Sequence, residues 1–138
     1  MLKIINPSNL IFISRWAIKL LSNLLLVLIA LGLYQALWAS PVDYVQGHSV
    51  RIMYVHVPSS WISLACFGII GFLSILNFIF KNRNLLLINQ SLAPIGLIFV
   101  VISIVTGSLW GQPTWGTWWA WDARLTSMLV LGIFYLFY

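Results

Sequence analysis

The tryptophans of this sequence are gathered in one short segment whose composition suits a flat apolar ligand. Five of the eight tryptophans lie within WGQPTWGTWWAWDAR, residues 110–124. A membrane-interface belt needs only an apolar ring with a wet edge, so it does not require clustering. The belt explanation suits Trp16, Trp38 and Trp61, each at the end of an apolar run. The cluster, with its Asp-x-Arg pair, instead favours an aromatic binding surface.

A helical conformation of residues 115–122 would place Trp115, Trp118, Trp119 and Asp122 on one face, because i+3 and i+4 positions are neighbours. That face would match a porphyrin, which is a large flat apolar disc. Its two propionates could pair with Arg51 and Arg124, since a guanidinium binds carboxylates in bidentate fashion.

A haem iron also needs an axial ligand, and neutral imidazole is a common one. The chain has two histidines, His48 and His56. His48, in QGH, is typical of an exposed turn. His56, in YVHVP, lies just before an apolar run. The sequence supports about equally two interpretations of it, an iron ligand and an ordinary polar residue at the membrane interface. Cys66 lies within an apolar run and is predicted to be a buried small residue.

The elements that must position these side chains are membrane helices. Apolar residues make up 62% of the chain and charged residues 7%, which is typical of integral membrane proteins. Four apolar runs predict spans over residues 20–40, 61–80, 85–109 and 125–138. Pro58 and the two serines after it predict that the second helix begins there. The fourth run is short for a crossing, so we expect the chain to be the N-terminal part of a longer protein.

The placement of basic residues predicts the orientation. The net charge of +5 forms no basic stripe, so we expect no nucleic-acid partner. One predicted side collects five of the basic residues: Lys3, Arg15, Lys19, Lys81 and Arg83. The N-terminus should therefore face the cytoplasm or the mitochondrial matrix, with residues 41–60 and 110–124 outside. A bacterial and a mitochondrial inner membrane fit equally.

Two motifs resemble those of a known family. WGTWWAWDARLT, residues 115–126, resembles the WWD signature of haem-handling membrane proteins of cytochrome c biogenesis, in the form found in the CcmC family. CcmF and CcsA, from the same superfamily, typically follow the Asp with an acidic residue, whereas Asp122 is followed by Ala-Arg-Leu-Thr. RIMYVHVPSSW, residues 51–61, is similar to the CcmC sequence that leads into the second helix. The resemblance covers nearly the whole chain.

The resemblance implies that the chain takes haem as cargo at the outer face and presents it to the haem chaperone CcmE. The implied partners are the ABC-type proteins CcmA and CcmB and the small protein CcmD. His56 matches the first axial histidine of the family. The WWD platform is matched by Trp115, Gly116, Trp118, Trp119, Trp121 and Asp122. The family has six spans and a second axial histidine in its last outer loop, which has no counterpart here.

The sequence leaves two other hypotheses about function open. One is a permease subunit of an ABC-type haem exporter, which would be expected to carry charged groups within its spans. The first three predicted spans contain none. The other is a non-functional truncated remnant. An enzyme is not predicted, because the sequence shows no nucleophile–base pair and its two carboxylates lie in different loops.

Overall fold

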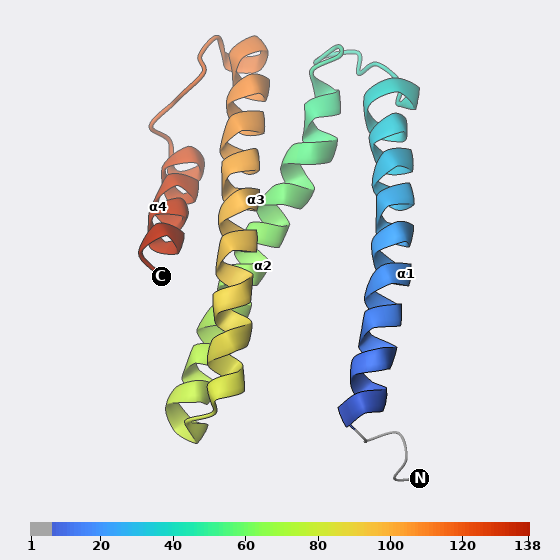
Figure 1. The fold of residues 1–138 in the computed structure, drawn as a ribbon. Helices are drawn as coiled ribbons and strands as arrows, with labels where there is room; N and C mark the ends of the chain where they lie inside the picture. Colours follow the sequence, from blue (N-terminus) through green and yellow to red (C-terminus); the bar gives the residue numbers. More distant parts are fainter. Residues whose placement is uncertain (1–6) are drawn as a thin grey trace. The chain divides into compact units, whose positions relative to one another are not determined.

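The computed structural model describes residues 7–138, which form helices joined by short connections (Figure 1). The chain runs through α1 (Pro7–Tyr34), a π-helical turn η2 (Gln35–Ala39), α2 (Val50–Phe80), α3 (Arg83–Trp115) and α4 (Ala123–Phe137). The described part of the chain contains no strand beyond one isolated bridge between Asp43 and Gly47. The predicted all-α fold is confirmed. Lys3 lies outside the described residues.

Three helical segments are long and apolar enough to cross a membrane. They are Ile13–Ala39, Val50–Phe80 and Arg83–Trp115, whereas α4 is a shorter apolar helix of 15 residues. The chain is therefore an all-α, multi-pass membrane protein. The predicted spans over residues 61–80 and 85–109 lie inside these helices, and the first, over residues 20–40, extends one residue beyond Ala39. The exact stretch embedded in lipid stays a prediction.

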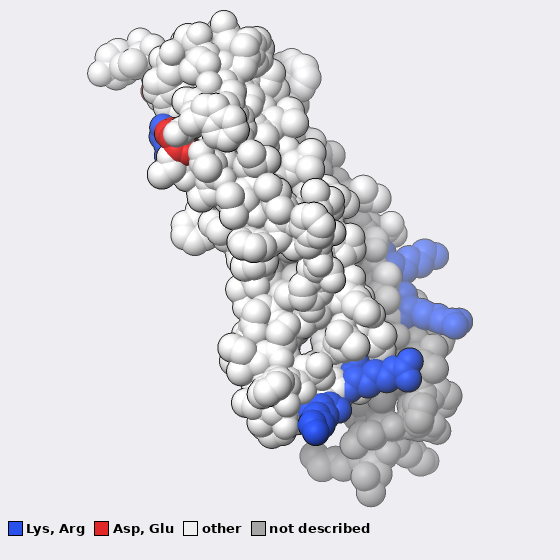
Figure 2. Space-filling model, turned by 90° about the vertical axis from the view of Figure 1, so that its left-hand side faces the viewer, with Lys and Arg blue, Asp and Glu red and all other residues white. Residues whose placement is uncertain are grey.

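The chain divides into two compact units, residues 1–40 and residues 41–138. The first holds α1 and η2, and the second holds α2, α3 and α4 together with both segments singled out in the sequence. In the second unit, charged side chains lie near the helix ends. Figure 2 shows one adjacent acidic and basic pair and, on the face in view, a broad surface without charge.

The predicted start of α2 near Pro58 is wrong. The helix begins at Val50, so Pro58 lies inside it and His56 lies in its second turn. Proline inside a membrane helix is tolerated because nearby groups satisfy the disturbed backbone. Pro58 leaves the carbonyl of Tyr54 without its helix partner. In the same turn, Ser59 Oγ donates to the carbonyl of Val55 at 2.7 Å, and Ser60 Oγ donates to the carbonyl of His56 at 3.0 Å.

Helices α2 and α3 form an antiparallel pair joined by a very short turn. Lys81, with φ of 50°, ends α2, and the Asn82 side chain accepts a bond from the Asn84 backbone N–H at the start of α3. Small and polar residues line the contact, as is usual between membrane helices. Ser60 and Ser103 hydroxyls lie 2.6 Å apart, and Asn89 Nδ2 donates to Ser74 Oγ at 3.0 Å.

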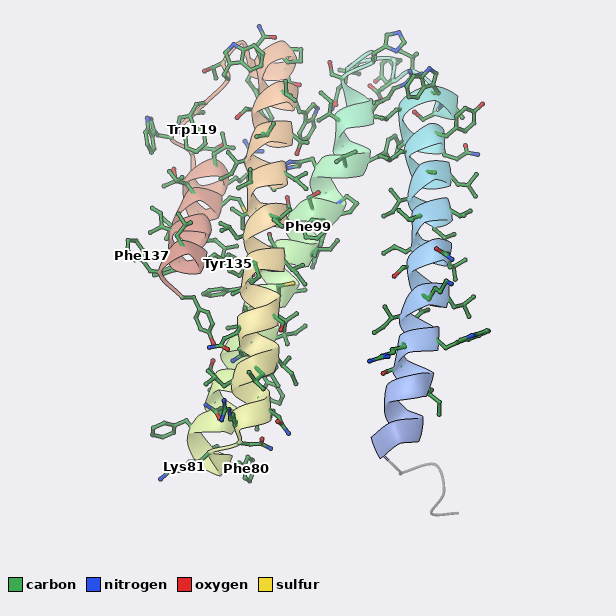
Figure 3. All side chains as sticks on the ribbon, in the orientation of Figure 1. Phe80, Lys81, Phe99, Trp119, Tyr135 and Phe137 are labelled. Carbon is green, nitrogen blue, oxygen red and sulfur yellow. The ribbon has the colours of Figure 1, made fainter. Side chains whose placement is uncertain are left out.

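Helix α4 packs on this pair through an apolar core. The buried apolar residues are Cys66, Ile70, Val100, Leu131 and Tyr135. The burial of Cys66 confirms its prediction. Tyr135 projects from α4 toward the α2–α3 pair (Figure 3), where its hydroxyl donates to the carbonyl of Ser63 at 2.6 Å. Its ring occupies the space beside Gly96 that a side chain would need. This core holds α4 against the α2–α3 pair.

Candidate functional site

The segments singled out in the sequence meet at the end of the second unit that lies away from the Lys81 turn. The loop of residues 41–49, the first turns of α2, the end of α3 and the loop of residues 116–122 all contribute. A hydrogen bond from Trp110 Nε1 to Gln46 Oε1, 3.0 Å long, connects the first loop to α3. Asp43 shapes that loop by accepting bonds from the backbone N–H groups of Gln46 and Val45.

His56 is half-buried and lies against α3. Its Nδ1 is 3.0 Å from the carbonyl oxygen of Ser103 and 3.1 Å from the hydroxyl of Thr106. The ring of Trp110 lies beside it, with 6.0 Å between the ring centroids. His48 lies in an exposed turn, as predicted.

His56 and the tryptophan-rich segment line a common recess made of two small pockets. The two pockets, of about 120 and about 110 Å³, share five lining residues: Gly107, Trp115, Asp122, Arg124 and Leu125. His56 and Trp110 complete the first pocket. Trp118 and Gly111 are among the residues that complete the second. The structure therefore brings together residues from three helices that are up to 69 positions apart in the sequence.

Asp122 and Arg124 form an ion pair at the rim of the recess. Asp122 Oδ1 accepts the backbone N–H of Leu125 at 2.9 Å, which caps α4. Its Oδ2 accepts bonds from Nη2 and Nε of Arg124 at 2.8 and 3.1 Å. The Leu125 N–H, followed by the Arg124 side chain, holds the pKa of Asp122 below its ordinary value. Arg124 lies over the Trp115 ring, 4.9 Å from its centroid, in a cation–π contact.

The tryptophans do not share one helical face, so that prediction is wrong. Helix α3 continues to Trp115 and ends at Gly116, whose φ of 76° is the left-handed conformation that favours glycine. Residues 116–122 are irregular. Thr117 Oγ1 bonds both the N–H and the carbonyl of Trp119, and such local bonds compete with helix formation. The rings of Trp119 and Trp121 meet edge to face, at 79°.

The recess includes only part of the predicted site. His56, Trp115, Trp118, Asp122 and Arg124 line it. The other predicted site residues, which line neither pocket, are Arg51, Gly116, Trp119 and Trp121. Arg51 lies in the first turn of α2, Gly116 ends α3, and the Trp119 indole N–H is buried without a hydrogen-bond partner in the described part of the chain.

Sequence reasoning missed Gly107 and Leu125 altogether and did not connect Trp110 to His56. The signal was the i+3 and i+4 spacing of Gly107, Trp110 and Gly111, which places them on one face of a helix. This spacing is meaningful only because α3 extends beyond residue 109, where the predicted span ended, to Trp115.

The fold and this recess define a multi-pass membrane protein with a histidine- and tryptophan-lined site at one end of its helices. The chain belongs to the CcmC family, described as heme exporter protein C, whose family model matches residues 1–138.

The names of curated relatives agree with this family assignment. Heme exporter protein C of Bradyrhizobium diazoefficiens is 40% identical over 131 residues, which are 95% of this chain and 49% of the relative. The Escherichia coli K12 protein of the same name is 39% identical over 94% of this chain and 53% of its own length. A cytochrome c biosynthesis ccmC-like mitochondrial protein of Marchantia polymorpha is 43% identical over 79% of this chain and 48% of its own. The chain thus spans about half the length of these relatives.

Proposed function

We propose that this chain handles haem as cargo, without acting as an enzyme, during cytochrome c maturation. One observation carries the proposal: His56, the Trp115 ring and the Asp122–Arg124 pair line the same recess. These groups have the chemistry that haem requires, namely an axial nitrogen ligand, an aromatic surface and a guanidinium for a propionate. Two bacterial relatives are named heme exporter protein C, which supports the same cargo.

The recess fits one part of a haem molecule and does not enclose it. Pockets that bury a drug-sized ligand measure roughly 300–1,000 Å³, whereas each pocket here is only about 120 Å³ or less. The bound porphyrin would therefore keep much of its surface outside the recess. Such partial exposure suits a protein that passes haem on. The side chain of Arg124, 72% exposed, can reach a propionate at the rim.

We further propose that the recess lies at the outer face of an inner membrane, bacterial or mitochondrial. At about 1.5 Å per residue, the 31 residues of α2 extend about 46 Å, against a hydrocarbon core of about 30 Å. The first turns of α2, with Arg51 and His56, then lie at the headgroup level. There the exposed Trp118 and Trp121 rings also suit the interface. Haem would be presented there to CcmE, with CcmA, CcmB and CcmD as partners of the complex.

The proposal is tested by haem absorption spectra of the purified 138-residue chain in detergent, oxidised and reduced. We expect the wild type to bind haem and His56→Ala to lose or alter the spectrum, with partial recovery on adding imidazole, which can fill the vacant position. The matched control is His48→Ala, which removes the other histidine and should leave the spectrum nearly unchanged. Identical spectra for wild type and His56→Ala would remove His56 from the site. Flux of haem into vesicles carrying the chain alone would instead favour the permease reading.

A further inference from the structure

The surroundings of His56 determine which ring nitrogen carries the proton. Nδ1 faces the Ser103 carbonyl oxygen at 3.0 Å, and a carbonyl can only accept. The second neighbour, the Thr106 hydroxyl, has its own proton directed at the carbonyl of Ile102, 2.7 Å away. Thr106 Oγ1 is therefore also an acceptor toward His56. The Ser103 carbonyl requires that Nδ1 be the donor, and Thr106, whose hydroxyl can donate to carbonyls of its own helix, can accept the same proton.

A neutral imidazole protonated at Nδ1 has its free electron pair on Nε2. Within residues 7–138, both hydrogen bonds of the His56 ring are made through Nδ1. Nε2 is thus the ring atom available as a ligand, on a residue that lines the recess. In metal sites a hydrogen bond at one nitrogen commonly fixes which nitrogen binds the metal.

Gly107 provides the space for this arrangement. A Cβ atom at Gly107 would lie 3.0 Å from Cε1 and 3.4 Å from Nδ1 of His56. Contact of this kind would push the ring away from α3 and lengthen the two bonds at Nδ1. Trp110, one turn further along α3, lies beside the same ring. The ring is therefore positioned by consecutive turns of α3.

We propose that Thr106 and Gly107 are positioning residues for His56, which hold its ring as the Nδ1–H tautomer and present Nε2 to the haem iron. Thr106 supplies an acceptor beside the Ser103 carbonyl, and Gly107 lets the ring approach. The statement about the iron rests on the proposed function. The statement about the tautomer does not, so the two can be tested separately.

The tautomer is tested on haem-free chain by ¹⁵N NMR of labelled histidine in detergent micelles, in a His48→Gln background that leaves His56 as the one histidine. We expect the proton on Nδ1 at a pH where the ring is neutral. Thr106→Val should shift the Nδ1 signal, and Thr106→Ser should restore it. The control Ser91→Ala removes a similar intrahelical hydroxyl bond, to the carbonyl of Leu87 near the other end of α3, and should change nothing. A proton on Nε2 in the parent chain, or an unchanged signal in Thr106→Val, overturns the proposal.

The consequence for the cargo is tested by haem titration and by the reduction potential of the bound haem. Loss of such an outer partner typically lowers metal affinity about 10- to 100-fold, so we expect losses of about that size for Thr106→Val and Gly107→Ala. Gly68→Ala is the control, because a Cβ atom there meets nothing within 4 Å.

The outcomes separate the two proposals. Wild-type affinity and potential in Thr106→Val and Gly107→Ala, together with lost binding in His56→Ala, would overturn the positioning role and leave the haem function standing. An Nδ1–H tautomer that depends on Thr106, in a chain that binds no haem, would overturn the haem function and support the positioning of the ring.

Discussion

At the scale of single residues, the two carboxylates of the chain organise backbone that leads into the site. Asp43 accepts the backbone N–H groups of Gln46 and Val45 and so shapes the loop whose Gln46 side chain bonds Trp110. Asp122 caps α4 and holds Arg124 at the Trp115 ring. The aspartate of the WWD motif therefore has a structural role in addition to any contact with cargo.

These roles predict how stability depends on acid. The backbone N–H groups of Gln46 and Val45 lower the pKa of Asp43, and the Leu125 N–H and Arg124 lower that of Asp122. Each carboxylate thus stabilises the fold above its ordinary pKa, and this contribution is lost as the pH falls through the lowered value. We expect the Tm of the detergent-solubilised chain to fall between about pH 5 and pH 3.

The matched variant is Asp43→Asn combined with Asp122→Asn, which keeps a side-chain acceptor at both positions without a titrating group. Its Tm should be nearly independent of pH over that range. A wild-type Tm that is equally flat would contradict the prediction. A double variant that loses stability in acid as steeply as the wild type would assign the acid dependence to other groups.

At the scale of elements, the placement of α4 depends on one tyrosine seated at a glycine. Tyr135 fills the space beside Gly96, donates to the Ser63 carbonyl and meets the Phe67 ring edge to face. A single residue of α4 therefore contacts both α2 and α3. Because Asp122 directly precedes α4, this packing also sets the position of the loop that contains Trp118.

We expect Gly96→Ala to destabilise the chain by about 1–3 kcal/mol, because its methyl group would overlap the Tyr135 ring in a packed core. Gly71→Ala in α2, where a Cβ atom meets nothing within 4 Å, is the control. In a Tyr135→Leu background the cost of Gly96→Ala should be smaller, since the overlapping ring is gone. Thermal unfolding in detergent of the parent, Gly96→Ala, Tyr135→Leu and the double variant measures this coupling. Purely additive effects of the two substitutions would contradict it.

At the scale of the whole molecule, the charges predict how the second unit lies in the membrane. Lys81 and Arg83 lie at the α2–α3 turn, whereas Asp43, Arg51, Asp122 and Arg124 lie at the opposite helix ends. Counted over the sequence, five of the seven basic residues, namely Lys81, Arg83 and the N-terminal Lys3, Arg15 and Lys19, lie on one predicted side. This bias predicts that the turn lies on the inner side. Because α2 and α3 are antiparallel and joined at this turn, the start of α2 and the end of α3, which form the recess, are then predicted to lie on the outer side.

Cysteine labelling in a Cys66→Ala background tests this topology. Val45→Cys and Gln112→Cys should react with a membrane-impermeant maleimide from the outer side, and Asn84→Cys only from the inner side or after permeabilisation. Val45, Gln112 and Asn84 are exposed, so access to the reagent does not depend on unfolding. Labelling of Val45→Cys and Asn84→Cys from the same side would exclude the predicted orientation.

Much of the fold and part of the candidate site follow from the sequence alone. Long apolar runs force helices, because lipid leaves the backbone no other source of hydrogen bonds. The local context of His48 and of the tryptophan cluster likewise indicated the exposed turn and the region of the recess. These properties belong to short segments, whose chemistry can be read without knowing their neighbours.

The tertiary structure decided which of these residues meet. The crossing of α2 and α3 brings Ser103, Thr106 and Gly107 to His56, across 47 to 51 positions of sequence. Helix α3 ends at the left-handed Gly116, and the segment after it is irregular, with local bonds from Thr117. Trp115 and Trp118 line the recess there, whereas Trp119 and Trp121 do not. Periodicity describes a helix only while the helix continues. Where it ends, and which face of a second helix packs against it, depends on contacts between residues far apart in the chain.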